Sequence, residues 1–279
     1  MINEIRGTID YAEFGEGPTV VFVPGSCSTG AAWKPILTHI GGCFRCVTTS
    51  LLGYGGTKER RSPGNASMVY EAEILESVVR RTGQPVHLVG HSFGGLTAIA
   101  VALRRQVPIL SLLVIEAPAM QILWHTGEHE HYRAFRQMTD AYFAEARLGR
   151  NDAIERMVDF FGGADTFAGW PQRVRDYAMQ TTKTNLLDFE AAYDFETTPI
   201  ALGNVDLPAL ILRGALSHPA MQRVNELLAY YMPYAAGASI NRTAHFMIST
   251  HPKELAEAIA GHVNANEPTV FARSRRRSG

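Results

Sequence analysis

The sequence has few cysteines, no long apolar run and no excess of charge of either sign. Its three cysteines, Cys27, Cys43 and Cys46, are too few and odd in number for a disulfide framework in a chain of 279 residues, which favours a reducing compartment. The longest strongly apolar run, Ile109 to Ile115, is far shorter than the roughly 20 residues that span a bilayer. Residues 1–6 carry charges without an apolar signal region. We therefore expect a cytoplasmic protein that does not associate with membranes.

Charge is scarce as well as balanced. The 26 basic and 27 acidic residues sum to −1, and charged residues make up 19% of the chain, against roughly 25% in an average soluble protein. A chain without an overall field does not attract polyanions, so nucleic acid is not an expected partner. The segment 267–279 is locally basic, and we expect it to be a disordered tail rather than an arm that binds nucleic acid.

In place of these features the chain has short apolar runs that alternate with helical patterns. Strands are expected at 8–14, 19–23, 44–50, 86–89, 110–115, 207–213 and, weakly, 238–241; helices are expected at 31–40, 67–81, 93–105, 221–231 and 252–263. Strands and helices in alternation indicate βαβ units and a parallel sheet that is covered on both faces. The sequence therefore predicts an α/β fold.

One long segment interrupts this alternation. From Met120 to about Asn204 the strand signal is lost and the chain is rich in aromatic residues and Met. Strands of one sheet flank this segment, so we expect a helical cap at 119–205 on a core formed by 1–118 and 206–266. Most of its apolar side chains must pack internally, while some should roof a pocket: Met120, Trp124, Met138, Tyr142, Phe143, Met157, Phe160, Phe161, Phe167 and Trp170.

The most specific motif is Gly90-His91-Ser92-Phe93-Gly94. This Gly-x-Ser-x-Gly pattern follows an apolar strand and begins a helix, which is the context of a nucleophile elbow. A serine on a strained turn between strand and helix requires small neighbours, and the helix N-terminus beneath it favours a nearby anion. Ser92 is therefore the predicted nucleophile.

With these residues the chain resembles the α/β-hydrolase superfamily over about residues 8–265. Pro24-Gly25-Ser26 takes the place of the family's His-Gly-x after the third strand, and Gly53-Tyr54-Gly55 that of its Gly-x-Gly loop. The resemblance implies a mostly parallel sheet of the eight-stranded type, with the cap inserted after strand six. It also implies an oxyanion hole made by the backbone N–H groups of Phe93 and Ser26. Because the usual His is absent, Cys27 is an alternative second donor.

A serine nucleophile needs a base, and in this family the order along the chain is Ser, acid, His. His245 follows the last weak strand and precedes the C-terminal helix, where the family has its histidine. His251 lies beside Pro252 at the start of a helix and is more typical of a capping or surface residue. His91 adjoins Ser92 on the turn and is not expected to face the same way. We therefore expect His245 to be the base.

The acid departs from the family pattern. Most relatives carry Asp shortly after strand seven, but residues 213–219 contain no carboxylate. A neutral side chain does not supply the charge that stabilises a forming imidazolium. Elimination leads to Glu116, which ends the predicted strand next to that of Ser92; certain haloalkane dehalogenases also take their acid from the end of strand six. The segment Glu116-Ala117-Pro118, with a serine after strand seven, also resembles a little-characterised esterase-like branch. The alternative is that Glu116 only caps the start of the cap segment and that the triad is incomplete.

We expect a serine hydrolase for a small or medium carboxylic ester, lactone or thioester with an apolar part, working through an acyl-enzyme without metal or cofactor. Candidate pocket residues are Cys27, Trp124, Phe143 and Phe246. Cleavage of a C–C bond or acyl transfer would use the same serine, whereas dehalogenases of this superfamily use Asp in its place. A catalytically silent protein that binds a small apolar ligand is the alternative from another class. The oligomeric state is left open.

Overall fold

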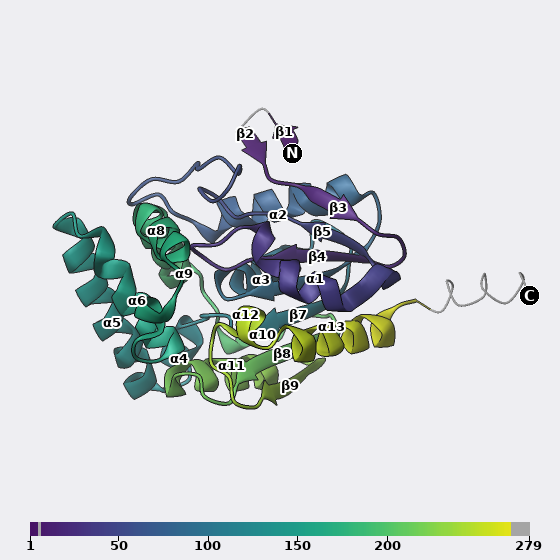
Figure 1. Ribbon diagram of the computed structural model, residues 1–279. Helices are drawn as coiled ribbons and strands as arrows, with labels where there is room; N and C mark the ends of the chain where they lie inside the picture. The colour runs from purple at the N-terminus through teal and green to yellow at the C-terminus, as the bar shows by residue number, and fades with distance from the viewer. Residues whose placement is uncertain (5–6, 269–279) are drawn as a thin grey trace, which may run out of the picture.

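The computed structural model describes residues 1–4 and 7–268. At its centre is a seven-stranded sheet of order β3-β5-β4-β6-β7-β8-β9 (Figure 1). The strands are β3 (Ala12–Phe14), β4 (Thr19–Val23), β5 (Arg45–Thr48), β6 (Val86–His91), β7 (Ile109–Ile115), β8 (Ala209–Gly214) and β9 (Ala235–Ile240). β3 is antiparallel to β5, and all other neighbours in this sheet pair in parallel.

Helices cover both faces of the sheet (Figure 1). One face packs against α1 (Lys34–Ile40), α12 (Met247–Thr250) and α13 (Pro252–Asn266), and the other against α2 (Met68–Thr82), α3 (Phe93–Arg104) and α11 (Pro219–Tyr231). Strand β4 shows why both faces are apolar. Val20 and Phe22 lie in the core on the side of α1 and α13, and Val21 and Val23 in the core on the side of α2 and α3, because successive side chains of a strand point to opposite faces.

Residues 119–205, the predicted cap, consist of helices and connecting loops. The helices are α4 (Gln121–His125), α5 (His129–Arg147), the 3₁₀ turn η3 (Asn151–Ala153), α6 (Ile154–Gly162), α7 (Thr166–Gly169), α8 (Gln172–Gln180), α9 (Thr182–Asp194) and α10 (Pro199–Leu202). Helix α9 packs against α2 and α3 and so rests directly on the core. The cap therefore meets the core beside the start of α3, where Ser92 lies.

The prediction of a mostly parallel α/β sheet is confirmed, with two differences. The main sheet has seven strands rather than the eight-stranded type, and the first predicted strand, 8–14, is divided. β1 (Ile2–Glu4) and β2 (Gly7–Ile9) form a separate antiparallel pair. The division falls at Asp10, whose backbone N–H is bonded to the Thr57 hydroxyl and whose carboxylate accepts a bond from the Gly56 N–H. Asp10 therefore bonds to the loop at residues 56 and 57, and no strand is formed at residues 10 and 11.

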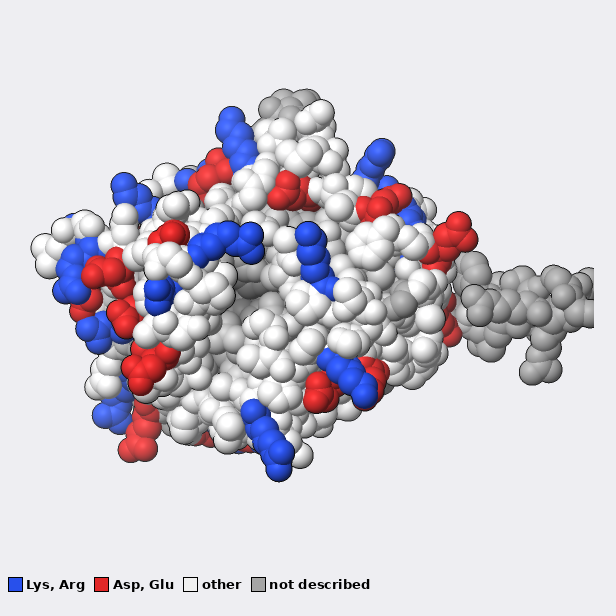
Figure 2. Space-filling model, viewed as in Figure 1, with Lys and Arg blue, Asp and Glu red and all other residues white. Residues whose placement is uncertain are grey.

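Of the predicted basic tail, 267–279, residues 269–279 lie outside the described residues. At residue 267, where the predicted tail begins, Glu267 Oε1 lies 2.9 Å from His87 Nε2, near the beginning of β6. On the face seen in Figure 2, basic and acidic side chains are interspersed. Within residues 1–4 and 7–268, no helix is both long and apolar enough to cross a membrane.

Candidate active site

Ser92 sits on a strained turn between β6 and α3. Its φ of 52° and ψ of −127° are rare for an L residue, and the residue is buried, with 8% of its surface exposed. Two glycines permit the close packing around it. A Cβ on Gly94 would lie 2.2 Å from the carbonyl oxygen of Pro24, and one on Gly25 would lie 2.9 Å from Ser92 Cβ. The loop after β4 therefore passes directly beside the serine.

His245 lies within hydrogen-bond distance of Ser92. The Ser92 Oγ to His245 Nε2 distance is 3.0 Å, although the two residues are 153 positions apart. On the other side of the ring, His245 Nδ1 lies 3.3 Å from Glu116 Oε2. With the Nδ1 proton donated to the carboxylate, Nε2 is free to accept the serine hydroxyl. Ser92, His245 and Glu116 thus form a continuous hydrogen-bonded line.

Glu116 is fully buried and its carboxylate has further donors. Oε1 accepts bonds from the Gly214 N–H at 2.7 Å and from the Ser217 hydroxyl at 2.8 Å. The residue adopts a left-handed φ of 53°, and its N–H continues the ladder by bonding to the Leu212 carbonyl. Both partners of Oε1 come from the end of β8 and the loop after it, the region for which the family resemblance implied an Asp. They orient the carboxylate and satisfy its charge.

His91 supports His245 through the backbone. Its Nε2 donates to the carbonyl oxygen of His245 at 2.9 Å, and the two ring centroids are 4.9 Å apart. Burial and the neighbouring His245 lower the pKa of His91 to about 3, so the ring is neutral at physiological pH. His91 therefore holds the loop that carries His245 and adds no charge.

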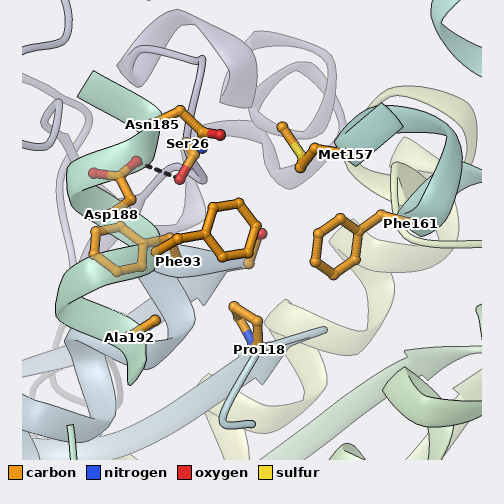
Figure 3. A pocket seen from close by; sticks show the side chains of 10 residues that line it. Ser26, Phe93, Pro118, Met157, Phe161, Asn185, Asp188 and Ala192 are labelled. Atoms are coloured by element: carbon orange, nitrogen blue, oxygen red, sulfur yellow. Dashed lines mark hydrogen bonds between the residues drawn. The ribbon is translucent and has the colours of Figure 1, made fainter. Parts of the chain in front are cut away.

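A small pocket opens onto Ser92 between core and cap. The core contributes Ser26, Ser92, Phe93 and Pro118; the cap contributes Met157 and Phe161 from α6, and Asn185, Asp188, Phe189 and Ala192 from α9. Figure 3 shows Ser26 and Asp188 on one side and Met157 and Phe161 on the other. The pocket is therefore apolar with one polar wall.

The family model described as "Alpha/beta hydrolase family" matches residues 20–258. The chain belongs to this family. Fluoroacetate dehalogenase from Burkholderia sp is 24% identical over 293 residues, which cover 97% of this chain and 95% of that protein. The pimeloyl-(acyl-carrier protein) methyl ester esterase of Aeromonas hydrophila is 24% identical over 264 residues, covering 90% and 98%. A further match, to Protein PHYLLO of Arabidopsis thaliana, spans only 7% of that protein's length at 32% identity.

Solved structures show the same fold for this α/β hydrolase. A thermophilic esterase from Thermogutta terrifontis superposes with a TM-score of 0.74 at 18% identity, and the match covers 93% of this chain and 94% of that one. Relatives of full length include esterases and dehalogenases. The family relationship thus supports a hydrolase of the α/β type. It does not identify the substrate.

The four pocket residues expected from the sequence are not among the residues that line this pocket. Trp124 is 53% exposed and contacts His129 and Tyr132, while Phe143 contacts Phe189 edge-on. Phe246 packs edge-on against the His245 ring. The Cys27 thiol lies beside Tyr54, and burial together with the charge of Asp188 raises its pKa to about 12. The packing of the cap helices decides which aromatic faces Ser92.

The polar wall of the pocket was missed by the sequence analysis. Asn185, Asp188, Phe189 and Ala192 recur at helical spacing on one face of α9, so the period was available as a signal. Two of the four are polar, however, and a polar residue in a helical pattern is ordinarily assigned to solvent. Their burial depends on partners that are distant in the sequence.

The described ranges, 1–4 and 7–268, contain no group of three or more His, Cys, Asp or Glu side chains arranged to hold a metal ion. Of the cap histidines at 125, 129 and 131, His125 pairs with Glu196 at 2.8 Å, and His129 packs on the ring of Trp124. Cys46 is buried and Cys43 exposed, and both thiols are free.

Proposed function

We propose that this chain is a serine hydrolase that cleaves a small or medium carboxylic ester, or a lactone or thioester, with an apolar acyl or alcohol part. The observation that carries the proposal is the hydrogen-bonded line from Ser92 through His245 to Glu116, with distances of 3.0 and 3.3 Å. This line supplies a nucleophile, a base of the required tautomer and an acid that balances the imidazolium.

The reaction follows from these positions. Ser92 Oγ attacks the carbonyl carbon as His245 Nε2 takes its proton, and the backbone N–H groups of Phe93 and Ser26 stabilise the oxyanion. Both residues line the pocket beside Ser92. His245 then gives the proton to the leaving oxygen or sulfur. Water, deprotonated by His245, attacks the acyl-enzyme and releases the acid.

Although the chain is similar to a dehalogenase, we do not propose that it displaces halide. A serine alkoxide that displaced halide from a saturated carbon would leave an ether on Ser92, which water does not readily hydrolyse. An acyl group on the same oxygen is an ester that the second half of the reaction removes. The hydroxyl at position 92 therefore favours substrates with a carbonyl carbon.

A fluorophosphonate probe together with p-nitrophenyl esters tests this function. We expect one covalent adduct on Ser92 of the folded protein, and Ser92→Ala should lose both labelling and turnover. Ser62→Ala, which changes an exposed serine, should retain both. Folded protein without an adduct on Ser92, or full turnover by Ser92→Ala, would contradict the proposal. The first outcome, with binding of an apolar ligand, would support the silent binding protein instead.

A further inference from the structure

The cap places a buried carboxylate beside the proposed oxyanion hole. Asp188 lies on α9, is 2% exposed and lines the pocket of Ser92. Its Oδ2 accepts the hydroxyl of Ser26 at 2.5 Å and that of Tyr54 at 2.6 Å, and its Oδ1 accepts Arg61 Nη1 at 2.8 Å. These three donors all belong to the core, whereas the acceptor belongs to the cap. Figure 3 shows the bond between Asp188 and Ser26 at the edge of the pocket.

Arg61 compensates the charge of this carboxylate and is itself held in place. Its guanidinium is fully buried, ion-paired to Glu71 at 2.9 Å and to Glu59 at 2.9 Å, and bonded to the carbonyl of Leu52. An isolated buried carboxylate would be costly, but one that faces a fixed guanidinium and two hydroxyls is satisfied in a single orientation. The position of Asp188 is therefore determined by the core even though its helix belongs to the cap.

Ser26 occupies the segment where a small displacement would matter most. It follows Gly25, which touches Ser92, and precedes Cys27, whose φ of 56° is left-handed. Catalytic hydrogen-bond donors work only at short range from the developing oxyanion, and an error of about 1 Å can cost on the order of 10²-fold in rate. The side-chain bond to Asp188 fixes the rotamer of Ser26 and restrains the peptide group that carries its N–H.

We propose that Asp188 is a positioning residue that reaches from the cap to hold Ser26, so that the Ser26 N–H points at the oxyanion. The cap then does more than cover the pocket, because its seating on the core completes the oxyanion hole. This inference rests on the proposed function and goes beyond it by assigning a role to a residue outside the triad.

Three variants test the role: Asp188→Asn, Ser26→Ala and the double variant. Ser26→Ala keeps the backbone N–H and removes only the hydroxyl that Asp188 holds. Loss of one aligned oxyanion donor costs about 10²–10³-fold in kcat, so partial misalignment should lower kcat by about 10- to 100-fold with KM changed less than about threefold. The double variant should be no worse than the slower single variant, because both changes break the same bond. The rate of fluorophosphonate labelling should fall in parallel with kcat.

Asp159→Asn is the matched control. This aspartate also lies in the cap, but its carboxylate accepts the N–H of Phe167, also in the cap. It should keep kcat within about twofold of wild type. Thermal unfolding of every variant separates loss of fold from loss of alignment, since a role confined to anchoring the cap would lower the melting temperature and leave kcat of the folded enzyme unchanged.

The possible outcomes separate this inference from the proposed function. If wild-type protein shows neither adduct nor turnover, the serine hydrolase proposal fails and the role of Asp188 fails with it. If wild type is active but Ser26→Ala or Asp188→Asn retains wild-type kcat, only the positioning role is overturned. A rise in KM with constant kcat in both variants also overturns it, because that pattern belongs to a direct contact with the substrate.

Discussion

Glu116 lies where it can serve as the acid of the proposed triad, in a chain whose residues 213–219 contain no carboxylate. Its left-handed backbone lies just after β7, one strand nearer Ser92 than the end of β8. The longer side chain of Glu spans the gap to His245, and the Gly214 N–H and the Ser217 hydroxyl occupy its second oxygen. In the proposed triad, Glu116 thus takes the role of the Asp that the resemblance implies after β8.

The charge of Glu116 is testable by Glu116→Gln. The amide oxygen should keep the two donors from Gly214 and Ser217, which turns the NH₂ group toward His245 Nδ1. That arrangement favours the tautomer with its proton on Nε2, which does not accept the serine hydroxyl. We expect kcat on a p-nitrophenyl ester to fall on the order of 10²-fold or more. The matched change Glu226→Gln on the surface of α11 should have little effect, and near wild-type turnover by Glu116→Gln would remove this residue from the mechanism.

At the scale of elements, α2 and the loop before it organise the charged network under the cap. Glu71 on α2 is fully buried and bonded to the Leu52 N–H and Arg61. Burial raises the pKa of Glu71 to about 7, although the positive charge of Arg61 opposes this shift. The network therefore contains a carboxyl group that titrates near neutrality.

This pKa predicts how stability depends on pH. Because the folded value of about 7 lies above the ordinary value of 4.5, the folded state binds this proton more tightly than the unfolded chain. The contribution of Glu71 is thus present below pH 4.5 and is lost as pH rises toward 7, by about 3 kcal/mol in total. Glu71→Gln should remove this fall from the free energy of unfolding, measured by urea titration at several pH values.

The comparison needs one control for the removal of a carboxylate. Glu257→Gln, on the exposed side of α13, leaves the buried network intact and should show the wild-type decrease between pH 4.5 and 7. An unchanged slope in Glu71→Gln would mean that another buried group is responsible.

At the scale of the whole molecule, the pocket exists only where cap and core meet. Four lining residues come from the core and six from two cap helices, so neither part forms this pocket alone. Met157 on α6 and Phe93 on α3 contribute to its apolar surface. The length of the acyl chain should therefore depend on the cap side chains.

Met157→Ala should shift the preference toward longer acyl chains. Removal of the buried Met side chain makes room for two or three methylenes, each worth about 0.8 kcal/mol when buried. The ratio of kcat/KM for p-nitrophenyl hexanoate over acetate should rise about tenfold or more. Met138→Ala, which shortens another buried cap Met that does not line this pocket, should leave the ratio unchanged. If Met157→Ala and Met138→Ala gave the same ratio of hexanoate to acetate turnover, the acyl chain would not bind beside Met157.

Much of this fold could be predicted from local patterns. The strands β4, β6, β7 and β8 are short apolar runs, and the helices between them have apolar faces, so a parallel sheet covered on both sides follows from burial alone. Ser92 and His245 could be proposed from the sequence because backbone strain requires glycines around the first and chain order restricts the second. Glu116 could be proposed because a carboxylate at the end of a buried strand is rare.

What only the tertiary structure decided are the contacts between distant segments. The sequence pattern placed apolar residues in the cap, but the crossing of its helices selected Met157 and Phe161 for the pocket and left Trp124 exposed. In the same way, Asp188 reads as a surface residue until Arg61, 127 positions away, supplies its counter-charge. The local sequence pattern determines which surfaces are buried, because the free energy of transferring an apolar side chain out of water depends on that side chain itself. Which polar groups can be buried depends on the partners they meet, and only the folded chain provides these.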